Sequence, residues 1–338
     1  MTVLRYNRYC LDNGVSVCIV PTGIGASIGG FAGDASRVAQ QIAEKIPVIV
    51  NPNVVNAACF SGIKDNMLYT EGFVINEFFK GNISLKPSQN NIIGVIFDKA
   101  ISEGIRNVHI NTMNAVKTVY GIDVVGYEVT EEPCGVEFFM TEEGISSGAV
   151  MNNETLLKAS KKMLSRGADV LAVVCHFEEP LEDGYKNGDS PDIIGGVEAI
   201  ISHYLSRELM VPVVHSPAFE NIEIDKSIVD KRAAAEYITP TFLPCLLVAL
   251  DKAPLLIPSF DNNYITVNNV HSVVMPSSAL GNSIVLDSIH RNIPVYAVQE
   301  NKTMLSVDKN ALCIDNAIIN IETYDEYVNN FLLERVTL

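Results

Sequence analysis

Basic residues are scarce in this sequence. Its 338 residues include 24 Lys and Arg against 40 Asp and Glu, which gives a formal net charge of −16. No Lys/Arg cluster is present to neutralise a phosphate backbone, so the composition argues against a nucleic-acid partner and disfavours anionic membrane surfaces. A substrate anion would have to be held by backbone amides or by a few local cations.

Long apolar runs are also missing. No run reaches the roughly 18–20 residues of a membrane-spanning helix, and residues 1–14 lack the apolar segment of a signal peptide. We therefore expect a cytoplasmic protein with no membrane partner.

Metal-binding cysteine and histidine motifs are absent as well. The seven cysteines are scattered singly, with no C-x-x-C pair, and no H-x-x-x-H or H-E-x-x-H spacing occurs. An odd number of cysteines in mostly apolar stretches is typical of reduced, buried thiols rather than of a disulfide frame or a zinc ribbon. We predict no metal site, although His176, His215 and Glu300 are a conceivable ligand set if their strands neighbour one another.

Cys134 is the one thiol that we would test as a nucleophile, because it lies in the loop-like stretch Glu132–Gly135. A thiol without a chemical role is the plainer alternative. Cys175 directly precedes His176, but adjacent residues of a strand point to opposite faces, so these two do not form a nucleophile–base pair.

The sequence does contain a clear strand–loop–helix–strand unit near its start. A strand is predicted over Val15–Val20, a glycine-rich loop over 21–30, a helix over 35–45 and a second strand over Val48–Val50. This layout is one βαβ unit, and it places free backbone N–H groups at the carboxyl edge of a parallel sheet.

Similar strand openings recur along the chain. An Ile-Pro-Val or Val-Pro-Val joint follows a helical pattern at 46–48, 211–213 and 293–295, and proline is tolerated at the first residue of a strand. The continuous apolar run Ala168–Phe177 is typical of a buried parallel strand. Strand–helix alternation over the whole length predicts an α/β fold with one or two mostly parallel sheets, flanking helices and Rossmann-like βαβ units.

Irregular segments suggest how the chain is divided. Pro133–Gly148 is Gly/Glu-rich, is expected to be irregular and could cover a cleft, and the acidic segment Glu178–Asp192 is the best lid candidate. We expect an N-terminal lobe over 1–150 and a C-terminal lobe over 151–338, with a single domain as the alternative.

Two loops are candidates for binding an anion. Glycines in the first loop would let a ligand approach the backbone, although their spacing is not that of G-x-G-x-x-G and no P-loop lysine follows. The second loop, 277–282, also lies between a strand and a helix. The alternatives are a tight crossing without a ligand at the first loop, and a helix cap formed by Ser278 or Asn282 at the second. The predicted ligand-binding residues are Thr22, Gly23, Gly25, Gly29, Gly30, Asn51, Asn53, Ser277, Ser278, Gly281, Asn282, Asn301, Lys302 and Thr303.

Proton transfer is assigned to His215, expected at the end of the strand Val213–Val214, together with Glu300 or His176. A structural histidine is the alternative. On the helix predicted over 194–208, Glu198 shares a face with Ser202 and not with His203, so a Glu–His pair within that helix is not expected.

Several uninterrupted blocks resemble a known family. They are PTGIGASIGGFAGDA, NPNVVNAA, ISHYLSRELMVPVVHSPA, RAAAEYITPTFLPCLLVAL and IPVYAVQENKT. Over residues 15–315 the chain is similar to an uncharacterised family of bacteria and plastids that is known only as a domain of unknown function. The resemblance implies that these blocks form a shared site, and it carries no reaction.

The leading hypothesis is an enzyme that acts on a small anionic metabolite, phosphorylated or carboxylate, with its reaction and cofactor open. A nucleotide-sugar enzyme of the glycosyltransferase or epimerase kind is one alternative, since residues 276–303 loosely resemble the nucleotide-sugar half of those proteins. A non-catalytic binding or assembly protein is another. A homo-oligomer is left open.

Overall fold

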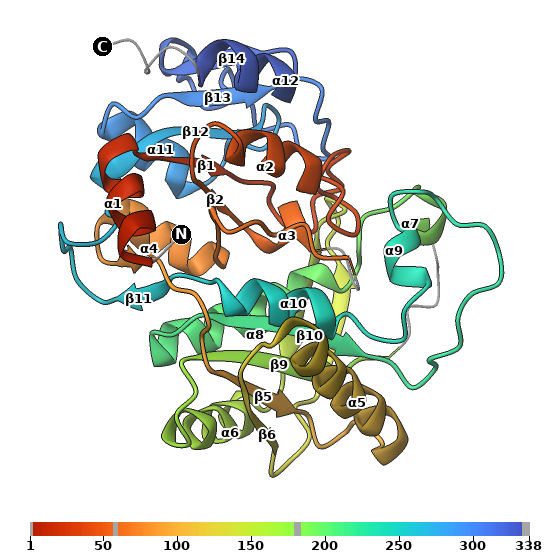
Figure 1. Ribbon diagram of the computed structural model, residues 1–338. Coiled ribbons are helices and arrows are strands. Elements are labelled where there is room, and N and C mark those ends of the chain that lie inside the picture. Colours follow the sequence, from red (N-terminus) through yellow and green to blue (C-terminus); the bar gives the residue numbers. More distant parts are fainter. Residues whose placement is uncertain (1–2, 57–59, 179–183, 333–338) are drawn as a thin grey trace.

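The computed structural model describes residues 3–56, 60–178 and 184–332. It contains two parallel sheets, one of six strands in the upper part of Figure 1 and one of four strands in the lower part. Helices flank both sheets. The predicted α/β class with mostly parallel sheets is therefore confirmed.

The six-stranded sheet combines the two ends of the chain. Its strands are β1 (Val15–Cys18), β2 (Val48–Val50), β3 (Met67–Tyr69), β12 (Val270–Pro276), β13 (Val295–Val298) and β14 (Ile318–Ile321). They lie in the order β14-β13-β12-β1-β2-β3, and all neighbours are parallel. This is the 3-2-1-4-5-6 order of a doubly wound sheet, whose switch point lies here between β1 and β12.

Helices cover both faces of this sheet. Side chains of α4 (Gly72–Lys80) and α11 (Ser283–His290) pack on one face, and those of α2 (Ser36–Ala43) and of α12 (Tyr324–Glu326) with the following turn at 327–331 pack on the other. All four residues of β1 are buried as a result. Two further helices, α1 (Val3–Asn13) and the single turn α3 (Pro52–Val55), complete this part.

The four-stranded sheet is built from the middle of the chain. Its strands are β5 (Ile93–Phe97), β6 (Val124–Val129), β9 (Val170–His176) and β10 (Val213–Ala218), in the order β10-β9-β5-β6 and all parallel. One face carries α5 (Glu103–Tyr120) and α10 (Leu243–Asp251); the other carries α6 (Asn153–Ser165) and α8 (Gly195–Leu209). One hydrophobic core includes residues of both sheets, and α10 lies between them (Figure 1).

Short elements join these two parts. The stretch expected to be irregular at 133–148 instead forms most of an antiparallel hairpin, β7 (Val136–Met140) and β8 (Ser146–Val150), so that prediction was wrong. Phe138 and Val150 of the hairpin pack on the core under α8. The burial of these apolar side chains offsets the conformational entropy that a glycine-rich segment loses when it becomes ordered. The remaining elements are β4 (Ser84–Lys86) paired with β11 (Leu255–Ile257), α7 (Gly184–Asn187) and α9 (Ala234–Tyr237).

Each sheet takes strands from both sides of residue 150. The division of the chain into sheets therefore does not coincide with the lobe boundary expected there.

Candidate functional site

The two predicted anion-binding loops lie on one rim. Loops 21–30 and 277–282 follow β1 and β12, which are parallel neighbours at the switch point. The chain itself fills this rim with residues 301–307. Ser27 N–H donates to the carbonyl of Lys302 over 2.7 Å, and similar bonds join Met304 to Ile24 and Val307 to Ser278.

Backbone amides of the glycine-rich loop donate hydrogen bonds to a carboxylate of the protein itself. Gly29 N–H donates to Asp34 Oδ1 over 2.7 Å, and Phe31 N–H donates to the same oxygen over 3.3 Å. Burial raises the pKa of Asp34, and these amides lower it. At this point the loop binds an internal anion.

Polar side chains predicted as ligands also bond to the protein. Asn51 contacts both the N–H and the carbonyl of Val20, and fully buried Asn301 does the same with Ile28. Asn282 accepts a hydrogen bond from the third residue of α11, so the helix-cap alternative is confirmed for it. Asn53 donates to the Pro21 carbonyl, Ser278 bonds to Thr303, Glu300 accepts from Tyr324 N–H, and Lys302 is exposed.

The glycines serve close contact between chain segments. A Cβ on Gly23, Gly25 or Gly281 would lie 2.8–2.9 Å from a side-chain atom of Ser146, Met304 or Val307 respectively. Gly23 and Gly25 also have positive φ angles, of 71° and 60°, which favour glycine. Thr22 contacts a different part of the chain, because its methyl group lies against Gly195 at the start of α8.

A cavity of about 510 Å³ lies beside the first turn of α8 and the strand β10. Its walls also include α7, α9, the first turn of α10 and the segments 190–194 and 219–225. Part of the predicted lid, 184–192, contributes to this wall, whereas its residues 179–183 lie outside the described part of the chain.

The cavity is acidic. Asp192, Glu198 and Glu236 line it together with Glu223 and Asp225, and no Lys or Arg does so among the described residues. Burial raises the pKa of Asp192 to about 6 and that of Glu236 to about 8. It also raises the pKa of Glu198 well above its usual range, and the charges of Asp192 and Glu236 add to this shift.

His215 is the one histidine of the described lining, and α8 holds its ring. Nδ1 lies 2.8 Å from the hydroxyl of Ser202, which donates to the Ala199 carbonyl over 3.2 Å. Because the Ser202 hydroxyl hydrogen points to that carbonyl, its oxygen accepts a hydrogen bond from Nδ1. Nδ1 therefore carries the ring proton, and Nε2 is an acceptor. Burial lowers the pKa of His215 to about 3, so the ring is neutral at pH 7.

Glu71 lies next to His203 and His215, outside the lining of the cavity. It follows β3, is 3% exposed and places Oε1 3.9 Å from His215 Nδ1 and Oε2 3.7 Å from His203 Nε2. Burial raises the pKa of Glu71 to about 8, against the opposing effect of Ser202, and lowers that of His203 to about 4. These three groups are therefore neutral together near pH 7.

The three residues predicted to transfer protons do not lie close together in the structure. His215 is the third residue of β10 rather than a strand end, because the strand continues through Pro217 to Ala218. It pairs with Val173, so His176 lies three residues further along β9 on the opposite face, where its Nε2 is 3.9 Å from Glu220. Glu300 belongs to the six-stranded sheet part.

Aromatic contacts close one side of the cavity. Tyr185 stacks on Phe31 with ring centroids 4.9 Å apart, and its hydroxyl accepts a hydrogen bond from Ala32 N–H. The Arg232 guanidinium lies 4.1 Å from the Phe31 ring centroid and pairs with Asp230. These contacts join the loop after β1 to the outer wall formed by α7 and α9.

A family model matches residues 15–336, which is most of the chain. Its description is a protein of unknown function, DUF3326. The chain belongs to this family. The resemblance seen in the sequence blocks is thus confirmed, and the cavity is a feature of a DUF3326 protein.

A relative is found in Synechococcus sp. (strain PCC 6301), where it is named an uncharacterized lipoprotein. It is 36% identical over 300 residues, which cover 86% of this chain and 83% of the relative. No solved structure matches. Within the described residues, no helix of this DUF3326 protein is long and apolar enough to cross a membrane.

Sequence reasoning missed most of the acidic cavity. Asp192, Glu198 and Glu236 come from separate segments with no shared motif. The available signal was the position of Glu198 on the same face of α8 as Ser202, one turn away, among buried apolar residues such as Val197 and Ile201. Cys134, expected in a loop, is fully buried and lies beside Cys175.

Proposed function

We propose that this protein binds a small organic cation, an amine or a guanidine, in the acidic cavity and acts on it by proton transfer. The observation that carries the proposal is the set of carboxyl groups, with Glu198 buried and Asp192 and Glu236 half-buried, around a cavity whose described lining has no Lys or Arg. A bound cation would lower the cost of ionising them, because an opposite charge favours the charged form of a carboxyl group.

The available hydrogen-bond groups point to the same ligand. Glu198, Glu236 and Asp192 accept hydrogen bonds when ionised, and Nε2 of His215 is an acceptor in the tautomer assigned above. An ammonium or guanidinium group supplies three to five N–H donors and accepts none. A phosphate or carboxylate would find no Lys or Arg among the described residues of the lining to balance its charge.

An organic cation fits better than a bare metal ion. No three of the cavity's described acidic and histidine residues have ligand atoms within 4.8 Å of one another. Carboxyl groups spread around about 510 Å³ suit a ligand with several atoms between its donor groups.

Glu198 is the residue to which we assign proton transfer. Once the bound cation has ionised it, its raised pKa makes it a stronger base than His215, so it would take a proton from the bound cation or from the carbon next to it and return the same proton. His215, whose pKa of about 3 makes its ring a weak base, would accept a hydrogen bond from the cation at Nε2, and Glu71 and Ser202 would position the ring.

Thermal unfolding with a panel of small ligands tests this proposal. We expect 1,4-diaminobutane or ethylguanidinium to raise Tm by a few degrees, because a ligand at 100 times its Kd adds about 2.7 kcal/mol of stability. Succinate, inorganic phosphate and UDP at equal ionic strength should have no such effect.

Variants on one helix supply the control. Glu198→Gln should abolish the shift caused by the amine, whereas Glu208→Gln, at the exposed end of α8, should leave it unchanged. Stabilisation by phosphate or UDP and by no cation would contradict the proposal and would favour the anionic metabolite or the nucleotide-sugar enzyme expected from the sequence. Those two functions, like a non-catalytic role and a homo-oligomer, stay predictions.

We also propose a cytoplasmic location. The thiols of Cys18, Cys134, Cys175 and Cys313 support it, because thiols stay reduced in that compartment. The name of the Synechococcus relative, a lipoprotein, does not fit this location. Recovery of the protein in the membrane fraction of lysed cells would contradict it.

A further inference from the structure

A second cluster of reactive side chains lies at the switch point of the four-stranded sheet. In chain order β5 comes first, β6 joins one side and β9 the other, so the switch point lies between β5 and β9. Asp98 directly follows β5, and Cys175 is the penultimate residue of β9. The crevice beyond such paired strand ends is where open α/β sheets bind ligands.

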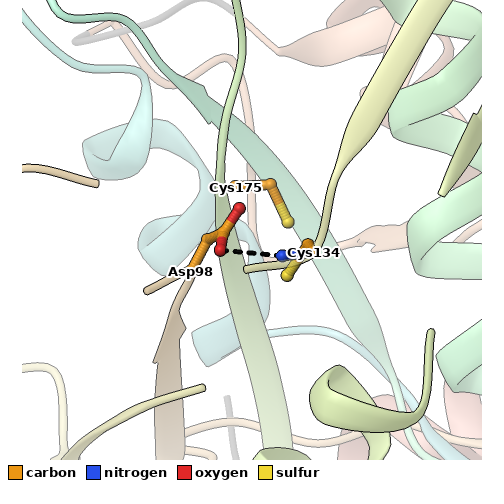
Figure 2. Close-up of side chains that lie close together, drawn as sticks. All are labelled: Asp98, Cys134 and Cys175. Carbon is orange, nitrogen blue, oxygen red and sulfur yellow. Dashed lines mark hydrogen bonds between the residues drawn. The ribbon is translucent and has the colours of Figure 1, made fainter. Parts of the chain in front are cut away.

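Cys134 completes this cluster from the loop before β7. Figure 2 shows its sulfur facing the sulfur of Cys175, with the Asp98 carboxylate beside both. One ligand atom from each residue lies within 4.8 Å of the others, and the side chains are at most 1% exposed. These are the only three His, Cys, Asp or Glu residues so grouped in the described parts of the chain.

The carboxylate is fixed in orientation by backbone amides. Asp98 Oδ1 accepts hydrogen bonds from Cys134 N–H and Ala100 N–H, each over 3.0 Å, and Oδ2 accepts a longer one, 3.3 Å, from His176 N–H. Oδ2 thus keeps lone-pair capacity for a further partner. Such outer hydrogen bonds are what hold a ligating carboxylate in place.

The surroundings of the two sulfur atoms are negative. The groups that shift the pKa of the Cys175 thiol all raise it: first the hydrogen bond with Cys134, then burial, then the charges of Cys134, Asp98 and Glu198. A divalent cation would reverse this local field and displace the thiol protons.

We propose that Asp98, Cys134 and Cys175 bind one zinc ion. Two thiolates and one carboxylate oxygen suit zinc, whereas magnesium and calcium prefer oxygen ligands only. On binding, the two thiol protons leave to solvent and no electron is transferred. Three protein ligands leave the fourth tetrahedral position for water or a substrate atom. This site is independent of the ligand proposed for the acidic cavity.

Zinc titration of the full chain against a chromophoric chelator tests the site. We expect one zinc per chain, with an affinity at least about 100-fold lower in Cys134→Ala and in Cys175→Ala. Cys18→Ala removes an equally buried thiol from β1 and should bind zinc as the unchanged protein does. Cobalt in place of zinc should give thiolate-to-metal charge-transfer absorption that is lost in the Cys134→Ala/Cys175→Ala variant.

A measurement on the unchanged protein covers the case in which a variant fails to fold. At a urea concentration at which the buried thiols of Cys134, Cys175 and Cys18 react in the zinc-free protein, zinc should protect Cys134 and Cys175 from alkylation, as mapped on peptides, and should leave exposed Cys313 reactive. Absence of stoichiometric zinc, unchanged affinity in folded Cys134→Ala/Cys175→Ala protein, or equal alkylation with and without zinc would overturn the proposal. So would a Cys134–Cys175 disulfide that forms in air in protein that takes up no zinc once reduced.

Discussion

Glu71 has an unusual environment for a charged residue. It is 3% exposed, and its Oε1 has no hydrogen-bond partner among the described residues. His203 and His215 lie 3.7 Å and 3.9 Å from its oxygen atoms, and burial lowers their pKa values to about 4 and about 3. Because neither ring is charged near pH 7, Glu71 gains nothing by ionising and stays protonated in the folded protein.

This environment predicts a pH-dependent stability. The folded-state pKa of about 8 lies above the ordinary 4.5, so the folded protein retains a proton that the unfolded chain releases between these values. The contribution of this group is complete below pH 4.5 and is lost as pH rises through 8. Between pH 6 and pH 8.5, we expect the free energy of unfolding to fall by about 2–3 kcal/mol more in the unchanged protein than in Glu71→Gln.

Urea denaturation at the two pH values measures this difference. Glu208→Gln removes an exposed carboxyl group from α8 and should leave the pH dependence unchanged. Equal slopes in the unchanged protein and Glu71→Gln would show that Glu71 is ionised in the folded state.

At the scale of single elements, the βαβ unit at the start of the chain is the best example of what sequence can predict. The strand Val48–Val50 has its predicted bounds, and β1 and α2 lie inside theirs, because apolar runs and helical periodicity are local signals. The occupant of the glycine-rich loop is not a local signal. It depends on Asp34 and on residues 301–307, which fold back from the other end of the chain.

Asp34→Ala tests whether the loop holds an internal anion. Two amides would lose their acceptor, so we expect stability to fall by about 1–3 kcal/mol. Inorganic phosphate should restore part of the lost Tm at constant ionic strength, because the exposed amides can then bind an added anion.

Exposed Asp12→Ala is the matched control and should respond to phosphate as the unchanged protein does. A stability loss in Asp34→Ala that phosphate does not reverse would mean that the loop has no anion-binding capacity of its own.

At the scale of the whole molecule, the candidate site depends on distant parts of the chain. Glu71 belongs to the first part, His215 and Glu198 to the middle, and the hydrophobic core that α10 shares with both sheets fixes their relative positions. Cys134 and Cys175 are likewise brought together only by the pairing of β5 with β9 and by the loop before β7. The spacing of these residues in the sequence does not show that they contact one another in the fold. The fold class was therefore predictable from the sequence, and the candidate site largely was not.

The central claim is that the acidic cavity binds a cation, and calorimetric proton counting tests it most directly. The amine from the panel with the largest Tm shift is titrated in buffers of different ionisation enthalpy between pH 6 and pH 8. We predict that binding releases protons and tightens as pH rises, because Glu198, Glu236 and Asp192 must ionise while the amine stays charged. No binding by any cation, or binding that takes up protons and weakens as pH rises, would contradict the claim.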